Sequence, residues 1–195
     1  QQTGAVNALW YRDRKLYGFN TDLLGFRDSI KKEKLENAKV CLLGAGGAAR
    51  AILYCLVHFF NPGEITLINR DPRRAGQLSL HFRTLPLIIK ENVAETYQGI
   101  DVIINTTPVG LFPDSTESPV PSGSFHPGQV VYDLVYNPLE TKMLRAARQA
   151  GAEVISGLEM LIQQGKHSFK IWTGKEMPVD LVRETLIGKL KQKVR

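Results

Sequence analysis

The sequence predicts an α/β protein built on a doubly wound parallel sheet, and two observations lead to this fold class. Short apolar runs, typical of buried strands, alternate with segments that have helical spacing or helix-capping signals. The first of these apolar runs leads directly into a turn with three glycines and then into a helical segment. Strands and helices that alternate in this order form a parallel sheet with helices on both faces, because the crossovers are right-handed.

The first strand, turn and helix of this sheet are predicted between residues 39 and 63. Lys39–Leu43 is an apolar run that indicates a buried strand, and a glycine-rich turn follows it at 44–49. Arg50–Phe60 has an apolar face and indicates a helix. Asn61-Pro62-Gly63 is a strong turn signal, so we expect the helix to end there.

The second strand and helix follow at once. Glu64–Ile68 is rich in β-branched residues, which favour a strand. Asp71 and Pro72 then supply an N-cap and a proline at the first helical position, which predicts a helix to about Phe82.

The second half of the sheet is predicted from residue 101 onward. Asp101–Asn105 and Val130–Leu134 indicate two further buried strands. A helix between Leu139 and Ala150, closed by Gly151, precedes a last strand at Glu153–Ile155. Two helical stretches without a strand between them, 157–172 and 178–193, complete the chain.

The composition is that of an ordinary globular protein with a slight basic excess. Of 195 residues, 43% are hydrophobic and 23% charged, which is enough to bury a core without disulfides or metal. Cys41 and Cys55 lie in apolar segments without metal-ligand spacing, so we expect reduced core thiols, no metal site and a cytoplasmic protein. No run approaches the length of about 18 apolar residues that a membrane span needs.

The net charge of +6 does not indicate a nucleic-acid-binding protein. The basic clusters at Lys31 to Lys39 and Lys189 to Arg195 contain no aromatic residues that could stack on bases, so we interpret them as solvated helix faces. A basic balance also suits a protein that holds a phosphorylated cofactor and a carboxylate substrate.

The glycine-rich turn predicts dinucleotide binding. Gly44-x-Gly46-x-x-Ala49 follows a strand and opens a helix, as the dinucleotide-binding fingerprint of Rossmann-like domains requires. The first glycine makes a tight turn, the second lets the backbone approach a pyrophosphate, and Ala49 keeps the helix close to the sheet. Free backbone N–H groups and the helix dipole would attract the phosphates. A turn with a structural role alone is the alternative.

The end of the second strand favours NADP over NAD. NAD-binding proteins usually place an acidic residue there to bind the ribose hydroxyls, whereas this strand ends in Ile68-Asn69-Arg70. A guanidinium at that point would attract a 2′-phosphate, and Arg73 and Arg74 add to the positive field. Asp71 is either the cap of the next helix or the acid of an NAD site.

Seven motifs in order identify a family resemblance that spans nearly the whole chain. The chain resembles the shikimate dehydrogenases, with no counterpart for about the first hundred residues of that family. The matching segments are Gly4-Ala5-Val6-Asn7, Gly18-Phe19-Asn20-Thr21-Asp22-x-x-Gly25, Gly44 to Arg50, Asn69-Arg70, Asn105-Thr106-Thr107-Pro108-x-Gly110, Asp133-x-x-Tyr136-x-Pro138-x-x-Thr141 and Gly157-Leu158-x-Met160-Leu161-x-x-Gln164.

The resemblance implies an oxidoreductase of aromatic amino acid biosynthesis, in which NADPH reduces 3-dehydroshikimate to shikimate. It implies that Asp22 is catalytic and contacts substrate hydroxyls, and that Asn7, Tyr136 and Gln164 bind substrate. Ala8 departs from the threonine usual after the asparagine. The lysine that pairs with the family's aspartate has no counterpart here, so we expect this chain to bind NADP but to be weakly active or inactive.

The same resemblance implies a set of cofactor-binding residues. From the glycine turn these are Gly44, Ala45, Gly46, Gly47 and Ala48, and from the second strand end Asn69, Arg70, Asp71 and Arg74; the others are Thr106, Thr107, Leu134, Gly157 and Met160.

Several alternatives stay open. Asp22 could cap a helix, Met160 could be a core residue and Tyr136 the edge of a core. The chain could be an NAD-preferring quinate/shikimate dehydrogenase or a catalytically silent NADP-binding regulatory module. We expect small-molecule partners and no nucleic acid or membrane, and leave open whether the chain forms a homodimer.

The resemblance also implies a domain division. We expect 1–25 to be a remnant of a substrate domain with the start of a linking helix, 26–156 to be the NADP-binding domain, and 157–195 to be helices that return toward the substrate domain. The chain lacks an initial Met, and Gly4-Ala5-Val6-Asn7 reads as the inside of a strand, so we expect a fragment whose substrate domain is mostly missing.

Overall fold

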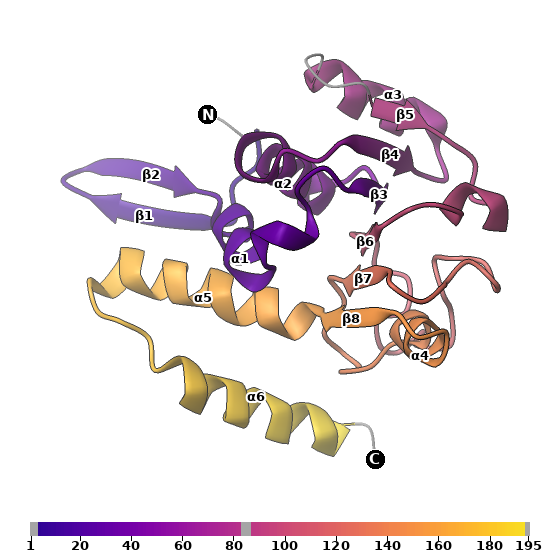
Figure 1. Ribbon diagram of the computed structural model, residues 1–195. Coiled ribbons are helices and arrows are strands. Elements are labelled where there is room, and N and C mark those ends of the chain that lie inside the picture. Colours follow the sequence, from indigo (N-terminus) through magenta and orange to yellow (C-terminus); the bar gives the residue numbers. More distant parts are fainter. Residues whose placement is uncertain (1–3, 83–86, 194–195) are drawn as a thin grey trace.

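The computed structural model describes residues 4–82 and 87–193, and it confirms the predicted fold class. Six parallel strands form one sheet in the order β5-β4-β3-β6-β7-β8 (Figure 1). The strands are β3 Lys39–Leu43, β4 Glu64–Ile68, β5 Leu87–Ile89, β6 Val102–Asn105, β7 Val130–Asp133 and β8 Glu153–Ser156.

Five of these strands lie within one residue of the predicted ends. The exception is β5, which the sequence did not reveal. It has three residues, and Ile88 and Ile89 are partly exposed because the strand lies at the edge of the sheet. A strand this short has no periodicity to detect.

The predicted helices are present, and two of them have starts shifted by three residues. α2 Gly47–Cys55 begins three residues before the predicted start, because Gly46 is its N-cap, and it continues through a π-helical turn at Leu56–Phe60. α4 Lys142–Gln149 begins three residues later than predicted, because the Thr141 side chain caps it. The other helices are α1 Thr21–Ser29, α3 Pro72–His81, α5 Gly157–Thr173 and α6 Val179–Lys193, with short 3₁₀ helices at Lys32–Lys34 and Ala94–Tyr97.

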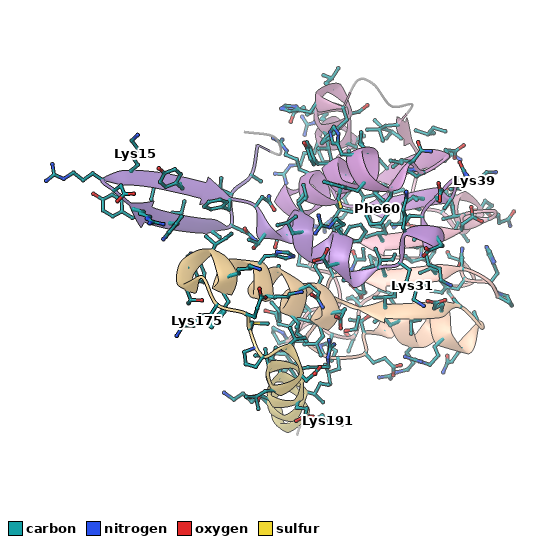
Figure 2. All side chains as sticks on the ribbon, turned by 60° about the vertical axis from the view of Figure 1, so that its left-hand side comes forward. Lys15, Lys31, Lys39, Phe60, Lys175 and Lys191 are labelled. Carbon is teal, nitrogen blue, oxygen red and sulfur yellow. The ribbon has the colours of Figure 1, made fainter. Side chains whose placement is uncertain are left out.

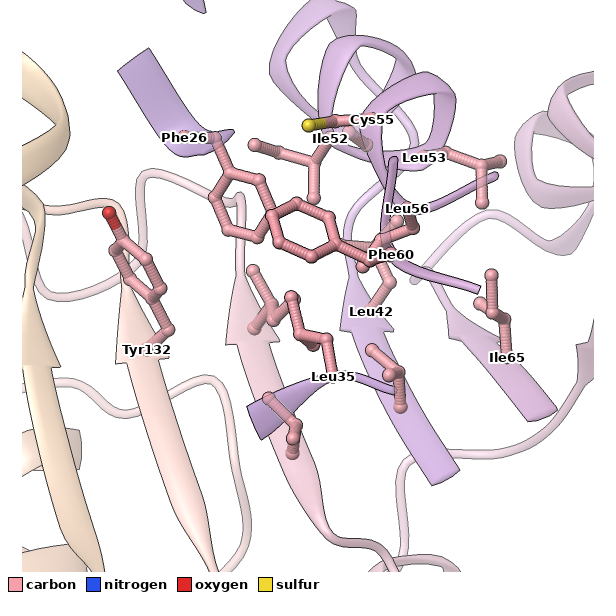
Figure 3. Close-up of a cluster of buried hydrophobic side chains, with 14 of the residues drawn as sticks. Phe26, Leu35, Leu42, Ile52, Leu53, Cys55, Leu56, Phe60, Ile65 and Tyr132 are labelled. Atoms are coloured by element: carbon pink, nitrogen blue, oxygen red, sulfur yellow. The ribbon is translucent and has the colours of Figure 1, made fainter. Parts of the chain in front are cut away.

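The two faces of the sheet carry separate hydrophobic clusters, as expected when helices cover both sides. Alternate residues of β3 face opposite ways, so Leu42 packs on one side and Cys41 on the other. Phe26 of α1 lies against the rings of Phe60 and Tyr132, with centroids 5.9 and 5.4 Å away (Figure 3). These contacts anchor α1 on the sheet one turn after Asp22.

The two cysteines are free and buried, one in each cluster. Burial raises the pKa of the Cys41 thiol to about 12, and that of the Cys55 thiol likewise to about 12. Both are therefore unreactive core thiols, as predicted.

A two-stranded antiparallel hairpin precedes α1 and projects from the body of the molecule (Figure 1). Its strands are β1 Ala8–Arg12 and β2 Lys15–Phe19, joined by Asp13 and Arg14 with positive φ. The interpretation of 4–7 as the inside of a strand is wrong, because β1 begins only at Ala8. Asn7 still donates its N–H to the Phe19 carbonyl at 3.0 Å, which holds it beside the start of α1.

The basic residues lie on the outside of the molecule. Lys15, Lys31, Lys39, Lys175 and Lys191 are all exposed, and Figure 2 shows all of them except Lys31 toward the edges of the molecule. They are spread over different sides rather than gathered in one stripe (Figure 2). The prediction of a helix face at Lys31 to Lys39 is wrong, because this segment holds only the short 3₁₀ helix Lys32–Lys34 and the first residue of β3; Lys191 does lie on α6.

Candidate functional site

Two cavities lie beside the loop that follows β6, where the sheet changes direction. The chain runs from β3 outward to β5, then returns to β6 and runs the other way to β8, so the switch point lies between β3 and β6. In open α/β sheets ligands bind at such a point, outside the carboxyl ends of the strands. One cavity measures about 490 Å³ and the other about 870 Å³, and Thr106, Thr107 and Pro108 line both.

The glycine turn forms one wall of the larger cavity. Gly44 has a φ of +104° and donates its N–H to the Ile68 carbonyl at 2.8 Å. A Cβ at Gly44 would lie 2.6 Å from Thr106 Oγ1, so the close approach of the two loops requires glycine. Ala49 is fully buried, which brings α2 against the sheet as predicted.

The start of α2 leaves room for an anion. Its N-cap is Gly46, which has no side chain to cap the helix, and a Cβ at Gly46 or Gly47 would meet nothing within 4 Å. Gly44, Ala45 and Gly46 line the larger cavity. Uncapped N–H groups and the helix dipole beside open space fit a dinucleotide pyrophosphate.

Three cations line the same cavity. Arg70 and Arg74 were predicted, and Lys90 was missed, because it follows the short strand β5 that the sequence did not reveal. Among the described residues of this lining, the one acidic residue is Glu91. A cavity with a net positive wall fits a phosphate better than neutral ribose hydroxyls.

Asp71 caps a helix. Its carboxylate accepts the Arg73 N–H at 3.0 Å at the start of α3, and Arg73 Nε lies 3.2 Å away. These hydrogen bonds lower the pKa of the Asp71 carboxyl. Asp71 is absent from the cavity lining that the described residues form, so the structure favours its capping role over cofactor contact.

The smaller cavity holds the polar residues predicted to bind substrate. Asn7 Nδ2 donates to Asp22 Oδ1 at 2.8 Å, and both residues line the cavity with Tyr136 and Gln164. Burial raises the pKa of the Asp22 carboxyl, and the hydrogen bond from Asn7 opposes that shift. The helix cap is Asn20, whose Oδ1 accepts the Leu23 N–H at 3.2 Å, so capping does not explain Asp22.

The opposite wall of the smaller cavity is apolar. Leu134 and Met160 line it, and Gly157 lets α5 begin against the end of β7. A Cβ at Gly157 would lie 2.1 Å from the Leu134 carbonyl oxygen, so no larger residue fits there. No lysine is among the described residues that line this cavity.

A buried cluster of polar side chains lies beside the loop 106–108, which lines both cavities. The cluster was not predicted, although its residues belong to the sequence motifs. Asp133 is fully buried and accepts hydrogen bonds from Asn105 Nδ2 at 2.9 Å, the Val135 N–H at 3.0 Å and Thr141 Oγ1 at 2.6 Å. Asn105 Oδ1 in turn accepts from Thr107. Burial raises the pKa of Asp133 to about 6. The cluster joins the ends of β6 and β7 and so fixes the wall that both cavities share.

The structure therefore brings nearly all the predicted site residues to two adjoining cavities. Gly47 and Asp71 are not in the described linings. The smaller cavity is lined by Asn7, Asp22, Ala48, Leu134, Tyr136, Gly157, Met160 and Gln164; the larger by Gly44, Ala45, Gly46, Asn69, Arg70 and Arg74; Thr106 and Thr107 line both.

The described part of the chain has no cluster of three His, Cys, Asp or Glu side chains placed to hold a metal ion. Among its helices, none is both long and apolar enough to cross a membrane.

Family models and curated relatives agree on one family. Residues 28–110 match the model "Shikimate / quinate 5-dehydrogenase", and residues 157–187 match "Shikimate 5'-dehydrogenase C-terminal domain". The shikimate dehydrogenase (NADP(+)) of Pelodictyon phaeoclathratiforme is 42% identical over 196 residues, covering 96% of this chain and 69% of the relative. That of Moorella thermoacetica is 43% identical over 192 residues, covering 94% and 65%. The chain thus spans about two thirds of the length of these relatives.

Solved structures share the fold as well as the sequence. A shikimate dehydrogenase in complex with NADP+ superposes with a TM-score of 0.88 at 35% identity, covering 97% of this chain and 68% of that one. The enzyme of Thermus thermophilus, solved with NADP(H) and shikimate, gives 0.83 at 34% identity over 97% and 69%. A quinate dehydrogenase of Corynebacterium glutamicum in complex with NAD gives 0.85 at 28% identity over 96% and 69%. This chain therefore belongs to the shikimate dehydrogenase family of oxidoreductases.

Proposed function

We propose that this chain supplies the NADP-binding domain and one side of the active site for the reduction of 3-dehydroshikimate to shikimate. The observation that carries the proposal is the junction of the two cavities. A cationic cavity at the glycine turn adjoins a smaller cavity that holds a paired carboxylate and amides, and one loop, 106–108, lines both. A hydride donor and its acceptor have to meet at such a junction.

The residues of the larger cavity fit NADP. Gly44, Ala45 and Gly46 would hold the pyrophosphate, while Arg70 and Arg74, with Lys90, would hold the 2′-phosphate. When bound, the nicotinamide supplies or accepts the hydride. Leu134, Gly157 and Met160 would lie beside its ring and keep water out of the hydride path.

The smaller cavity fits a small polyhydroxylated carboxylic acid. The Asp22 carboxylate accepts a hydrogen bond from a substrate hydroxyl, and the amides of Asn7 and Gln164 orient the ring. Because burial raises its pKa, Asp22 is suited to take part in the proton transfer that accompanies reduction of the carbonyl. Tyr136, 39% exposed, would lie at the mouth beside the substrate carboxylate.

We further propose that this chain alone turns over slowly. A carboxylate needs a cationic partner to hold substrate and relay the proton, and none of the described residues around the smaller cavity is a lysine. We retain the division into 1–25, 26–156 and 157–195 as a proposal; its first boundary lies inside α1, and its second coincides with the end of β8.

The nearest competing function is an NAD-preferring quinate/shikimate dehydrogenase, since a quinate dehydrogenase with NAD has the same fold. The cations of the larger cavity and the capping role of Asp71 favour NADP. A regulatory module that only senses NADP is a second alternative, and the polar lining of the smaller cavity argues against it.

Calorimetric titration tests the proposal in two stages. NADP+ is expected to bind at least about tenfold more tightly than NAD+, as one charge-assisted hydrogen bond would give. Shikimate should then bind the NADP+-loaded chain, and Asp22→Asn should weaken that second step, with the exposed Asp180→Asn as control. Equal affinity for NAD+ would favour the quinate enzyme, and saturable NADP+ binding without any shikimate binding would favour the regulatory module.

A further inference from the structure

We propose that Thr21 is a positioning residue whose hydroxyl holds the oxygen of the Gln164 amide and so fixes the amide that faces the substrate. This inference rests on the proposed function and concerns a residue outside the lining of both cavities. Thr21 is 1% exposed, at the first position of α1. Its Oγ1 lies 3.2 Å from Asn7 Oδ1, 3.2 Å from Gln164 Oε1 and 3.0 Å from Ser168 Oγ.

The orientation of the Asn7 amide follows from an obligate donor. The backbone N–H of Thr21 lies 2.8 Å from the Asn7 side chain and can only donate, so the atom that faces it is Oδ1. Nδ2 must then point the other way, where it donates to Asp22 Oδ1. Asn7 therefore offers the cavity a second N–H and no acceptor, because its oxygen is held at the helix.

The orientation of the Gln164 amide follows from an obligate acceptor. The Leu161 carbonyl lies 3.0 Å from the Gln164 side chain and can only accept, so the atom that faces it is Nε2. Oε1 is then the atom beside the Thr21 hydroxyl. Only this hydroxyl, among the partners that the structure gives the Gln164 amide, holds Oε1.

We assign the hydrogen bonds around Thr21 from what each of its partners can donate or accept. A threonine hydroxyl has one hydrogen, and both amide oxygens beside it can only accept. The third partner, Ser168, is 5% exposed and can supply a hydrogen to Thr21 Oγ1. Asn7 Oδ1 already accepts a hydrogen bond from the Thr21 N–H. We therefore assign the single hydroxyl hydrogen of Thr21 to Gln164 Oε1.

The result is a fixed pattern of donors and acceptors in the smaller cavity. The Asn7 and Gln164 amides each present a second N–H, and Asp22 keeps one carboxylate oxygen for a further donor. This pattern selects a substrate that offers hydroxyl oxygens as acceptors to two amides and a hydroxyl hydrogen to the carboxylate. Removal of the Thr21 hydroxyl would leave the Gln164 amide held by the Leu161 carbonyl alone, so that its second N–H would no longer be fixed toward the substrate.

Thr21→Val tests the proposal, because valine keeps the shape and the backbone N–H and loses only the hydroxyl. In the NADP+-loaded chain, the affinity for shikimate should fall about tenfold, as expected for one buried hydrogen bond, while Thr21→Ser stays within about threefold of the original. NADP+ affinity should not change in either variant. The Gln164 side-chain amide signals in NMR should shift more in Thr21→Val than those of Asn7, whose oxygen still accepts the backbone N–H of residue 21. Thr185→Val, on the exposed side of α6, is the matched control.

Each outcome decides the matter. A Thr21→Val chain with unchanged Gln164 amide signals and unchanged shikimate affinity would overturn the proposal. Loss of NADP+ affinity in the same variant would also overturn it, because it would show a general structural role. If Thr21→Val does not fold, Ser168→Ala should still weaken shikimate binding about threefold, because the Thr21 hydroxyl loses the donor that orients it. Unchanged shikimate binding in Ser168→Ala would then count against the proposal. If the original chain binds no shikimate, the proposed function fails, and the amide signals still test the role of Thr21.

Discussion

At the scale of single residues, the site depends on which of two chemically reasonable roles each side chain has. Asp22 and Asp71 both stand at helix starts, where carboxylates commonly act as caps. The structure separates them, because Asn20 caps α1 and leaves Asp22 to the cavity, whereas Asp71 itself caps α3. Neighbouring arginines differ in the same way: Arg74 lines the larger cavity and Arg73 pairs with Asp71.

The arginines provide a test of cofactor selection. Arg70→Ala and Arg74→Ala should each raise the Kd for NADP+ by about 10- to 100-fold, since a hydrogen bond to a charged group contributes about 1.5–3 kcal/mol. The Kd for NAD+ should hardly change, because NAD+ has no 2′-phosphate. Arg73→Ala is the control: its side chain is 89% exposed and absent from the lining, so its effect should stay within about threefold. Equal losses for NADP+ and NAD+ would contradict this assignment.

Asp133 gives a prediction about pH. Its pKa is raised from 3.8 to about 6 by burial, so the folded protein binds the proton more tightly than the unfolded chain between these values. The free energy of unfolding should therefore fall as the pH rises from about 4 to 6, by about 3 kcal/mol from this group, and level off above. Urea unfolding at several pH values, compared with Asp133→Asn, isolates this contribution from the other carboxylates. A difference between the two proteins that is independent of pH would refute it.

At the scale of elements, the site is made where α1 meets α5. α1 carries Asp22 and Thr21, and α5 carries Met160, Gln164 and Ser168, so the two helices must run close together. Gly25 allows this approach: a Cβ there would lie 2.8 Å from the Gln164 backbone nitrogen and 2.9 Å from the Met160 carbonyl oxygen. The packing of α1 against α5 therefore explains why the Asn-Thr-Asp-x-x-Gly segment ends in glycine.

Gly25→Ala should push the two helices apart. Because the atoms it would meet are backbone and the Gln164 Cβ, little can yield, and we expect a loss of about 1–3 kcal/mol of stability. The control is Gly165→Ala, also within a helix, where a Cβ would meet nothing within 4 Å; there the better helix propensity of alanine should stabilise by about 0.5–1 kcal/mol. Thermal unfolding of both variants measures the difference, and equal effects would show that the crossing is not tight.

At the scale of the whole molecule, cofactor binding should stabilise the whole sheet against unfolding. The larger cavity is lined by the ends of β3 and β4 and by the segments after β4, β5 and β6, so a bound dinucleotide ties these elements together. NADP+ at about 100 times its Kd should stabilise the folded chain by about 2.7 kcal/mol. For a chain of this size this corresponds to a rise in Tm of about 5–10 °C. NAD+ at the same concentration should give a clearly smaller shift; an equal shift would contradict selection for the 2′-phosphate.

Much of this molecule could be predicted from order along the chain. The alternation of apolar runs and helical segments determined the sheet and the strand limits to within a residue, except at β5, where three partly exposed residues carry no pattern. The glycine turn and the arginine after β4 were readable because their chemistry is local: a turn, a helix start and a charge lie within a few residues of each other. The motifs also identified the family, which the comparisons confirmed.

Only the tertiary structure decided which side chains, distant in the sequence, contact one another. Lys90 lines the same cavity as Arg70 and Arg74 because β5 pairs with β4. Asp133 is held in the interior because the side chains of Asn105 and Thr141 donate hydrogen bonds to it. Thr21 and Gln164 are separated by 143 positions and meet because Gly25 lets α1 approach α5. The sequence alone determined which chemical groups this protein has and the elements that carry them. Which groups touch depends on the packing of those elements, since a hydrogen bond requires two atoms to lie about 3 Å apart and no local pattern sets that distance.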